Sequence, residues 1–509
     1  MEERKKQIKI GIILNYVNMI LGNLIPIFYT PIMLSLLGQS EYGLYKLSSS
    51  VTSYLSLVSM GLGSAITRYL IKAREEEGKE AEKRMLGLFN VIFNIIAVVA
   101  LIAGVALTVN LHRWYGDSLS IQEVKRMKLL VLMMVINMSL SFSQSPYLSI
   151  VTAHEKFLFY QCMNILSTCV TPILNIVALY AGFASVGMTV VSLAVSIVTR
   201  FVYQVYVRRS MGMKPCYKGM PTNMLGDIVK FSFWIFVSNV VGQLYNATDT
   251  VMIGMVPALA TTGVAVYNVG ITLSSMIGNI STGISSLMTP MANRMVFQGA
   301  DGEELTTLAI KVGRIQGFIA MLLISGFISF GRPFVYLYAG EDYVESYWVA
   351  ICIAVPAVIH LVQSVCLSIL TAENKHRFRS LMYLFIAALN VIGTWFLMKR
   401  WGVVGAAAMS GIATVIGQGF IMNWYYHKCT NLNMKRFWKE VLPVFPIPVI
   451  MIACMLVVNR FVDFYSLSML LLGIMVFTFV FIVLIWNLSL NKFEKRTVLE
   501  LLQKRKMKE

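Results

Sequence analysis

Charged residues are scarce in this chain of 509 residues: they make up 13% of it, whereas hydrophobic residues make up 57%. A soluble domain carries roughly 25% charged residues, because water must solvate its surface. The composition therefore excludes an ordinary soluble protein. Apolar stretches of roughly 20 residues, the length of a helix that crosses a bilayer, recur along the chain and indicate a membrane protein.

Motifs for several kinds of enzyme are missing. The sequence has no G-x-x-x-x-G-K-[ST] loop for ATP, no G-x-S-x-G nucleophile motif and no cluster of His, Cys and carboxylates that predicts a metal site. Its seven cysteines form no C-x-x-C pair, and we interpret them as small hydrophobic residues. We therefore expect no cofactor, no metal and no enzymatic activity.

Acidic residues are few compared with basic ones, 25 against 43, which leaves a net charge of +18. If the N-terminus lies inside the cell, 32 Lys and Arg residues fall in inner segments and 8 in outer segments. This bias follows the positive-inside rule and predicts that both termini are cytoplasmic. The inner charge favours contact with anionic membrane lipids. It is spread over many loops, so we expect no nucleic-acid partner.

Long apolar runs without strand-like alternation predict an all-α polytopic membrane protein. We expect fourteen transmembrane helices, at 9–36, 43–70, 87–109, 127–151, 158–181, 185–207, 226–256, 262–293, 311–331, 345–370, 379–398, 403–425, 440–459 and 466–488.

One thirteen-residue segment occurs twice in similar form. Gln144–Lys156 reads QSPYLSIVTAHEK and Gln363–Lys375 reads QSVCLSILTAENK, with eight identities at an offset of 219. A second correspondence, at an offset of 222, aligns Tyr45–Thr67 with Tyr267–Thr289. These matches relate spans one to six to spans seven to twelve, as in transporters with parallel repeats.

The repeat predicts two pseudo-symmetric six-helix lobes followed by two C-terminal helices. We expect an N-lobe at 1–207, a cytoplasmic linker at 208–225, a C-lobe at 226–425, the helical appendage at 440–488 and a basic cytoplasmic tail at 489–509. In repeat transporters the substrate site lies where the repeats meet.

Polar side chains recur at helical spacing inside several spans. Such residues tend to face a cavity, although Ser and Asn also join packed helices through hydrogen bonds. A polar cavity poor in charge suits a neutral, hydroxyl-rich ligand such as a sugar. The candidate sugar-binding residues are Asn15, Asn18, Lys46, Asn239, Gln243, Asn246, Asn268 and Asn279.

Basic residues near the inner ends of spans form a second set. Arginine offers a forked set of donors that fits phosphate oxygens, although these side chains can also simply reach the interface. The candidate diphosphate-binding residues are Arg68, Arg200, Arg294, Lys311 and Arg314. Asp249 and His360 are candidates for an ion or proton site, with a structural role as the alternative.

Two stretches carry family-like motifs. The first is Leu34–Leu70 (LSLLGQSEYGLYKLSSSVTSYLSLVSMGLGSAITRYL). The second combines Asn246–Val256 (NATDTVMIGMV) with Val264–Gly270 (VAVYNVG). Both stretches resemble bacterial polysaccharide-export flippases of the multidrug/oligosaccharidyl-lipid/polysaccharide exporter superfamily, and Asp249, Gly254 and Tyr267 match the pattern of that family.

The resemblance implies a flippase that moves undecaprenyl-diphosphate-linked oligosaccharides from the inner to the outer leaflet of the bacterial cytoplasmic membrane. It also implies alternating access driven by a membrane potential or an ion gradient, and a role in making O-antigen, capsule or exopolysaccharide. The last two spans would hold the lipid tail. We expect a monomer, with polysaccharide synthesis enzymes as possible partners.

Two other functions remain open. An ion-coupled multidrug or cation antiporter of the same superfamily shares the twelve-span repeat, but it usually lacks two extra spans and needs more buried carboxylates. A membrane glycosyltransferase or O-antigen polymerase would need catalytic groups on sizeable outer loops, which this sequence lacks.

Overall fold

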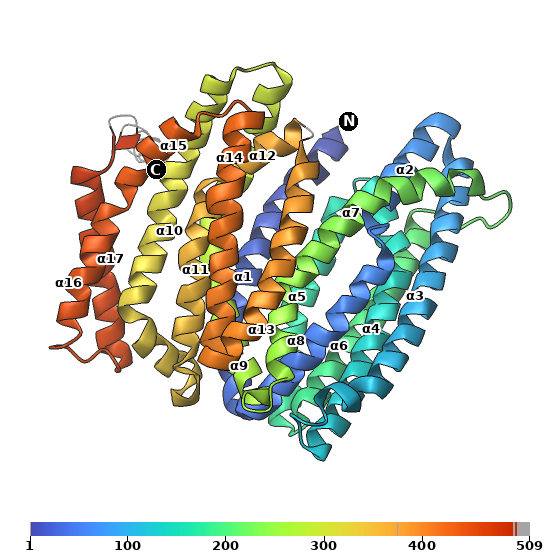
Figure 1. Ribbon diagram of the computed structural model, residues 1–509. Coiled ribbons are helices and arrows are strands. Elements are labelled where there is room, and N and C mark those ends of the chain that lie inside the picture. Colours follow the sequence, from blue (N-terminus) through green and yellow to red (C-terminus); the bar gives the residue numbers. More distant parts are fainter. Residues whose placement is uncertain (1, 374, 492–493, 496–509) are drawn as a thin grey trace. The chain divides into compact units, whose positions relative to one another are not determined.

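The computed structural model describes residues 2–373, 375–491 and 494–495, and the described chain is helical throughout, without strands (Figure 1). Its helices in the first part of the chain are α1 (Glu2–Ser53), α2 (Gly63–Glu77), α3 (Lys79–Tyr115), α4 (Ile121–Ala153), α5 (Phe157–Tyr180) and α6 (Ala184–Val205). They are followed by α7 (Leu225–Asn246), α8 (Thr248–Gly254), α9 (Ala260–Phe297), α10 (Gly302–Ala339), α11 (Ser346–Val362) and α12 (Ser364–Ala372). The last are α13 (His376–Thr414), α14 (Met422–Cys429), α15 (Met434–Val441), α16 (Pro446–Val458) and α17 (Leu467–Leu488). The all-α membrane fold is thus confirmed.

Twelve helical elements of the described residues are long and apolar enough to cross a membrane. Two of them, Ile13–Ser59 and Phe378–Cys429, contain 47 and 52 residues, more than twice the roughly 20 residues of one crossing. The first is interrupted at Gly38, whose φ of 73° is left-handed, and the second at Gly402, with a φ of 58°. Each element therefore has room for two crossings, and the count of fourteen stays a prediction.

The described chain divides into two compact units. Unit 1 runs up to Asn268 and includes Val391–Val403; unit 2 comprises Val269–Asn390 and the chain from Val404. Helices α7 and α8 and the first turns of α9 thus pack with α1–α6. The predicted lobe boundaries, which were drawn from the repeat, stay a prediction.

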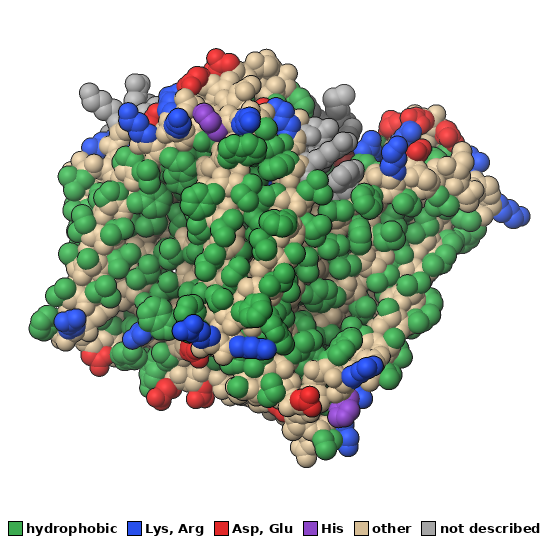
Figure 2. Space-filling view, in the orientation of Figure 1, with side chains coloured by type: hydrophobic (Ala, Val, Ile, Leu, Met, Phe, Trp, Pro, Cys, Tyr) green, Lys and Arg blue, Asp and Glu red, His purple; other side chains and the backbone are tan. Residues whose placement is uncertain are grey.

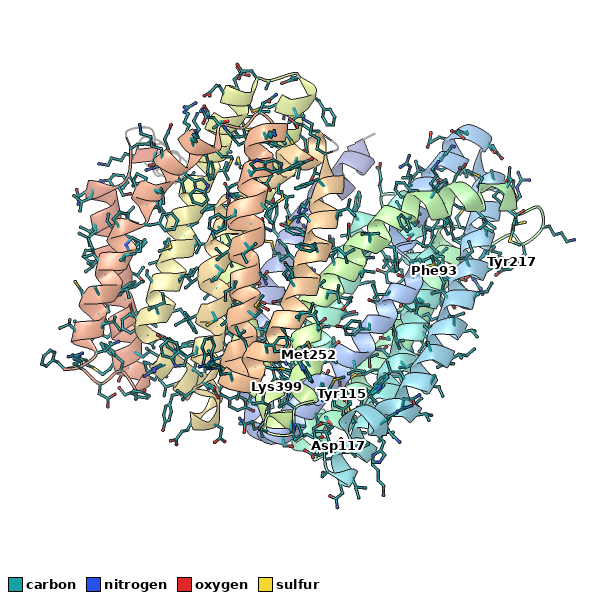
Figure 3. The ribbon with its side chains drawn as sticks, in the orientation of Figure 1. Phe93, Tyr115, Asp117, Tyr217, Met252 and Lys399 are labelled. Carbon is teal, nitrogen blue, oxygen red and sulfur yellow. The ribbon has the colours of Figure 1, made fainter. Side chains whose placement is uncertain are left out.

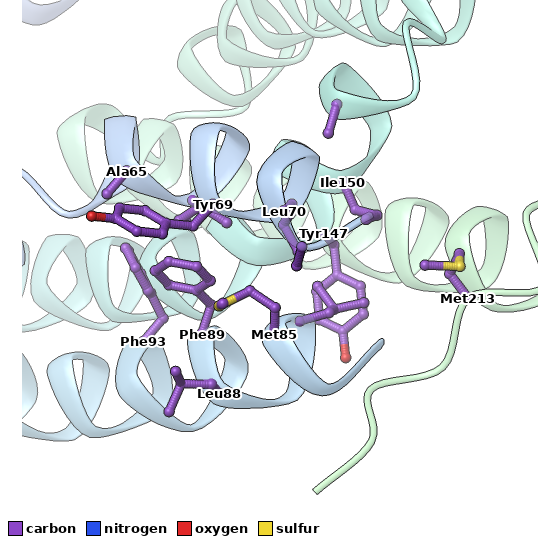
Figure 4. Packing of buried hydrophobic residues seen from close by; sticks show 14 of the residues in the cluster. Ala65, Tyr69, Leu70, Met85, Leu88, Phe89, Phe93, Tyr147, Ile150 and Met213 are labelled. Carbon is purple, nitrogen blue, oxygen red and sulfur yellow. The ribbon is translucent and has the colours of Figure 1, made fainter. Parts of the chain in front are cut away.

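A buried apolar cluster holds one end of unit 1 together (Figure 4). Leu70 of α2, Phe89 of α3 and Ile150 of α4 are completely buried in it, and Met213 of the linker joins them. Burying one such side chain contributes roughly 1.5–3 kcal/mol relative to its exposure to water. The cluster therefore fixes the short loops at this end.

Loops that the charge pattern assigns to one side of the membrane lie together in unit 1. The hydroxyl of Ser118, between α3 and α4, donates to the Gly254 carbonyl oxygen (2.9 Å). Figure 3 shows Lys399 at the same end. At the opposite end the Cys216 amide donates to the Lys83 carbonyl oxygen (3.0 Å). The alternation of loops between the two ends agrees with the predicted order of spans.

The helices carry an apolar exterior, as a lipid-facing surface requires. Hydrophobic side chains cover their middle portions, and Lys and Arg gather near their ends (Figure 2). Phe385 and Phe479, for example, are more than 60% exposed. This surface and the span pattern make the chain a multi-pass membrane protein.

Candidate functional site

A buried carboxylate forms the centre of a polar cluster in unit 1. Asp249, in the first turn of α8, is 2% exposed. Its Oδ2 accepts a hydrogen bond from the Tyr267 hydroxyl of α9 (2.6 Å), and its Oδ1 accepts one from the Thr394 hydroxyl of α13 (3.2 Å). A carboxylate in an apolar interior is costly unless it is protonated or near a cation. Two hydroxyl donors thus hold the buried Asp249 carboxylate, and its role as an ion or proton site stays a prediction.

The residues on either side of Asp249 extend this cluster. The Thr248 hydroxyl shares a hydrogen bond with the Tyr54 hydroxyl of the 3-10 turn at Tyr54–Ser59. The Asn268 amide of α9 donates to the Thr250 hydroxyl (3.3 Å) and to the Val264 carbonyl oxygen (2.9 Å). Three consecutive residues, 248–250, thus contact three other segments of the chain: the turn at 54–59, α9 and α13.

Gln243 of α7 links the cluster to the end of α1. Its Oε1 accepts a hydrogen bond from the Ser53 hydroxyl (3.1 Å), and its Nε2 donates to the Ser56 hydroxyl (2.9 Å). Gln243, a member of the predicted sugar-binding set, therefore contacts two serines of the segment 53–56 directly. A change in the position of α7 relative to the end of α1 must break or shift these bonds.

Other members of the predicted sugar set lie in different surroundings. Asn15 accepts a hydrogen bond from Gln161 (3.1 Å), and Asn18 accepts one from Thr168 (3.1 Å), so both join α1 to α5. This is the packing role that the sequence left open. Three further members lie away from the cluster: Lys46 lies 5.5 Å from the Tyr42 ring, and Asn239 and Asn279 are exposed. The side chain of Asn246 lies outside the described residues.

The five predicted phosphate-binding residues divide between the units. In unit 1, Arg68 is exposed on α2 with its guanidinium 4.5 Å from the Phe231 ring, and Arg200 is half-buried on α6. In unit 2, Arg294 ends α9 and Lys311 lies in α10, and both are exposed.

Arg314 of α10 is the exception among the basic residues, because it is 6% exposed and its guanidinium is engaged by protein oxygens. Its Nε and Nη2 donate to the two carboxylate oxygens of Glu494 (2.6 and 3.0 Å). Nη1 donates to the Glu440 carbonyl oxygen (2.6 Å), and Nη2 also donates to the Ser489 carbonyl oxygen (2.8 Å). These bonds fasten the segment after α17 to α10.

The structure also places residues that sequence reasoning did not single out. Thr394 reaches Asp249 across 145 residues of sequence, and no motif or spacing signals that contact. Glu82, fully buried in α3, lies 2.9 Å from His154 and 3.8 Å from Arg74. The sequence around Glu82 is that of a charged inner loop, and it does not predict that this carboxylate is buried. His360, the second ion candidate, is exposed on α11.

An apolar groove of about 430 Å³ lies between α10, α16 and α17. Its lining includes Phe330, Met451, Phe464, Gly473 and Phe477. A second apolar pocket of about 300 Å³ continues from it between α9, α10 and α17, and Phe330 and Phe477 line both. These spaces suit a hydrocarbon chain.

Known proteins resemble this chain in sequence and in fold. A family described as "Polysaccharide biosynthesis protein" matches residues 8–296. Among curated protein sequences, none matches. The lipid II flippase MurJ, in an inward closed conformation, is similar over 93% of this chain and 97% of its own, with a TM-score of 0.72 and 14% identity.

Two MATE transporters share the same architecture. An inward-facing MATE family transporter of the MOP superfamily is similar over 82% of this chain and 95% of its own, with a TM-score of 0.63 and 14% identity. The Vibrio cholerae MATE transporter VcmN, in its bent form, is similar over 86% of this chain and 100% of its own, with a TM-score of 0.54 and 15% identity. At these identities the likeness shows the fold, which is that of transporters and flippases. Because the family match covers more than half of the chain, this chain belongs to the polysaccharide biosynthesis protein family.

Proposed function

We propose that this protein is a flippase for a lipid-linked oligosaccharide, which it moves from the inner to the outer leaflet of the bacterial cytoplasmic membrane. The lipid would be undecaprenyl diphosphate, and the product would serve synthesis of O-antigen, capsule or exopolysaccharide. Membership of the polysaccharide biosynthesis family supports this class of cargo. The fold shared with a lipid II flippase supports the same kind of movement.

The apolar groove between α10, α16 and α17 is the observation that carries the proposal. Flipping requires a polar head to cross hydrocarbon, where each unpaired polar group costs several kcal/mol. The tail needs only an apolar surface along the protein, such as the groove lined by Phe330 and Phe477. A multidrug antiporter for cationic drugs has no need of a tail groove, so this feature favours a lipid cargo.

The exposed residues Arg68, Arg294 and Lys311 and the half-buried Arg200 would capture the diphosphate at the predicted inner surface. We assign Arg314 a positioning role instead, because protein oxygens already occupy its donors. Gln243, with Asn239, Asn246, Asn268 and Asn279, would line the path of the sugars. Movement would follow alternating access between the two repeats.

Asp249 would couple this movement to an ion or proton gradient. Its carboxylate is bound by Tyr267 and Thr394, and its neighbour Thr248 is bound to Tyr54. A change in the charge of the carboxylate would alter these hydrogen bonds and bias the packing of α8 against α1. The predicted cytoplasmic termini and monomeric state belong to the same proposal.

Translocation in reconstituted vesicles tests the function. The cargo is a fluorescent undecaprenyl-diphosphate oligosaccharide, and a membrane-impermeant quencher reports its leaflet. We expect translocation by the wild type, and a strong loss in Val480→Trp, which fills the groove. Phe479→Trp is the matched control, since the adjacent Phe479 is 69% exposed and lies outside the groove lining. Equal rates in both variants would contradict the role of the groove.

The same vesicles separate the two alternative functions. A new glycosidic bond in the product would identify a glycosyltransferase or polymerase, whereas a flippase changes only the leaflet. Export of cationic dyes without movement of the lipid-linked sugar would identify a multidrug antiporter.

A further inference from the structure

A polar pocket of about 620 Å³ adjoins the apolar groove in unit 2. It lies between α10, α11 and the loop 459–466, which joins α16 to α17. We call it the arginine pocket, because Arg332 and Arg460 line it. Val462 and Phe464 line both the groove and this pocket, so the two form one continuous surface that is apolar along the helices and polar at their end.

Contacts with α10 hold the loop that forms one wall of the pocket. The side-chain amide of Asn459 donates to the Ser329 carbonyl oxygen (2.8 Å). The Phe464 ring meets the Phe330 ring edge-on, with centroids 5.2 Å apart. The pocket wall is therefore built by specific packing at each end of the loop.

Arg332, Arg460 and Ser329 contribute hydrogen-bond donors to the lining of the arginine pocket. The Arg332 guanidinium lies 5.6 Å from the Tyr347 ring and 5.1 Å from the Trp348 ring, which orient it without using its N–H groups. Neither Arg332 nor Arg460 forms an ion pair with a carboxylate of the described residues. Ser329 is 2% exposed, and its hydroxyl has no hydrogen-bond partner within the described chain. A buried hydroxyl without a partner is costly and points to a ligand that supplies one.

The charge of the pocket selects an anion. One carboxylate, that of Asp463, also lines it, and its Oδ1 accepts a hydrogen bond from the Tyr465 amide (2.9 Å). Two guanidinium groups against one carboxylate leave the pocket positive. Arginine and hydroxyl donors together match the several oxygens of a phosphate group.

We propose that the arginine pocket binds the diphosphate head of the lipid whose tail lies in the groove, after the head has crossed the membrane. The charge pattern of the sequence places this end of α10 on the outer side, so the pocket is an exit site. The continuity of pocket and groove favours a ligand with a long hydrocarbon tail and a large anionic head. The identity of this lipid rests on the proposed function.

Site-specific crosslinking tests the exit site. A photoreactive benzoylphenylalanine replaces Phe461, which lines the pocket and is 84% exposed, and the protein is placed in phosphatidylcholine vesicles that contain undecaprenyl diphosphate in both leaflets. We expect a lipid crosslink that falls about tenfold in Arg332→Gln/Arg460→Gln, because charge-assisted bonds to phosphate are lost. Arg113→Gln, an exposed arginine outside the pocket, should leave the crosslink unchanged.

A second photoreactive position controls for changes in the fold. Leu488, at the other end of α17, is 73% exposed, and crosslinking there should not depend on Arg332 or Arg460. Ser329→Ala should weaken the crosslink at position 461 by a smaller factor. Addition of inorganic pyrophosphate or phosphatidylglycerol should not displace the lipid.

Three results would overturn the exit site: no crosslink at position 461, an equal crosslink in the double arginine variant, or displacement of the lipid by phosphatidylglycerol as effective as displacement by undecaprenyl diphosphate. The crosslink requires no translocation, because both leaflets contain the lipid. Failure of the exit site therefore differs from failure of the flippase proposal, in which the wild type moves no cargo.

Discussion

The guanidinium of Arg314 and the carboxylate of Glu494 form a two-bond ion pair in which both side chains are at most 7% exposed. The pair joins α10 to the segment that follows α17. It thus fixes the C-terminal helices against the element that forms the other wall of the apolar groove. Arg314, which the sequence predicts to bind phosphate, is therefore paired with Glu494 in the structure.

Glu494→Ala should lower stability strongly, because it leaves the Arg314 charge buried without its partner. Loss of one member of a buried pair costs about 3–5 kcal/mol. The measurement is thermal unfolding of the purified protein in detergent. Arg314→Leu/Glu494→Leu should be less destabilised than either single leucine variant, and additive effects in this double-mutant cycle would contradict the coupling.

Asp249→Asn should uncouple transport from the ion gradient while keeping the fold. Asparagine retains an oxygen that can accept from Tyr267 or Thr394 but cannot change its charge. We expect the gradient-driven rate to fall about tenfold or more, the size of effect expected when about 1.4 kcal/mol or more of coupling is lost. The measurement is translocation with and without an imposed proton or sodium gradient. A variant that still responds fully to the gradient would exclude Asp249 as the coupling site.

Gly43→Ala should prevent correct assembly of unit 1. A methyl group at Gly43 would overlap the Thr261 carbonyl oxygen, and that segment is held in place by a hydrogen bond between the Ser40 and Thr261 hydroxyls (3.1 Å). Overpacking against fixed backbone costs about 1–3 kcal/mol or more. Gly22→Ala, in the same helix, has nothing within 4 Å of the new methyl group and serves as the control. The readout is the yield of monodisperse protein on size-exclusion chromatography.

Arg68→Gln/Arg294→Gln should reduce translocation about tenfold, since two charge-assisted contacts to the diphosphate are removed. Arg209→Gln, an exposed arginine at the predicted inner surface, is the matched control. The assay is the vesicle experiment described above, with protein insertion measured in parallel. Full activity of the double variant would show that diphosphate capture needs neither Arg68 nor Arg294.

Membrane-impermeant maleimide should label Cys216 and Cys429 in inverted vesicles and not in intact cells. Both cysteines are free, partly exposed and on loops predicted to be cytoplasmic. Cys216→Ser and Cys429→Ser assign the label to each position. Labelling in intact cells would reverse the predicted orientation.

The repeated segments 144–156 and 363–375 predict the same local structure at two positions far apart in the chain, and the ends of their helices confirm this. Helix α4 ends at Ala153 and α12 at Ala372, and the next helices begin at Phe157 and His376, so both pairs keep the offset of 219. The equivalent residues Thr67 and Thr289 each contact a hydroxyl of the repeated segment, Thr152 (3.4 Å) in unit 1 and Ser368 (3.1 Å) in unit 2. These two partners are not equivalent, because Ser368 corresponds to Ser149 at the offset of 219. The repeat could be recognised from the sequence because its two copies have the same residues at the ends of equivalent helices.

The compact units, by contrast, followed no pattern in the sequence. Residues 391–403 pack with unit 1, although the repeat assigns them to the second lobe, and through them Thr394 reaches Asp249. Neither the burial of Glu82 nor the pairing of Arg314 with Glu494 has a local signal. Hydrophobic periodicity reports which residues face lipid or protein, but it does not report which distant residue a polar group will meet.

The sequence by itself determined the membrane setting, the helical class, the order of the spans and the family. Each of these depends on composition or on short motifs that act through the bilayer and the local backbone. Only the tertiary structure decided which polar groups form hydrogen bonds and where the arginine pocket and the apolar groove lie. It also decided that Arg314, among the candidate phosphate-binding residues, is paired with a carboxylate of the protein. Those features depend on contacts between segments far apart in the chain, because a side chain's partner is set by packing and not by its neighbours in sequence.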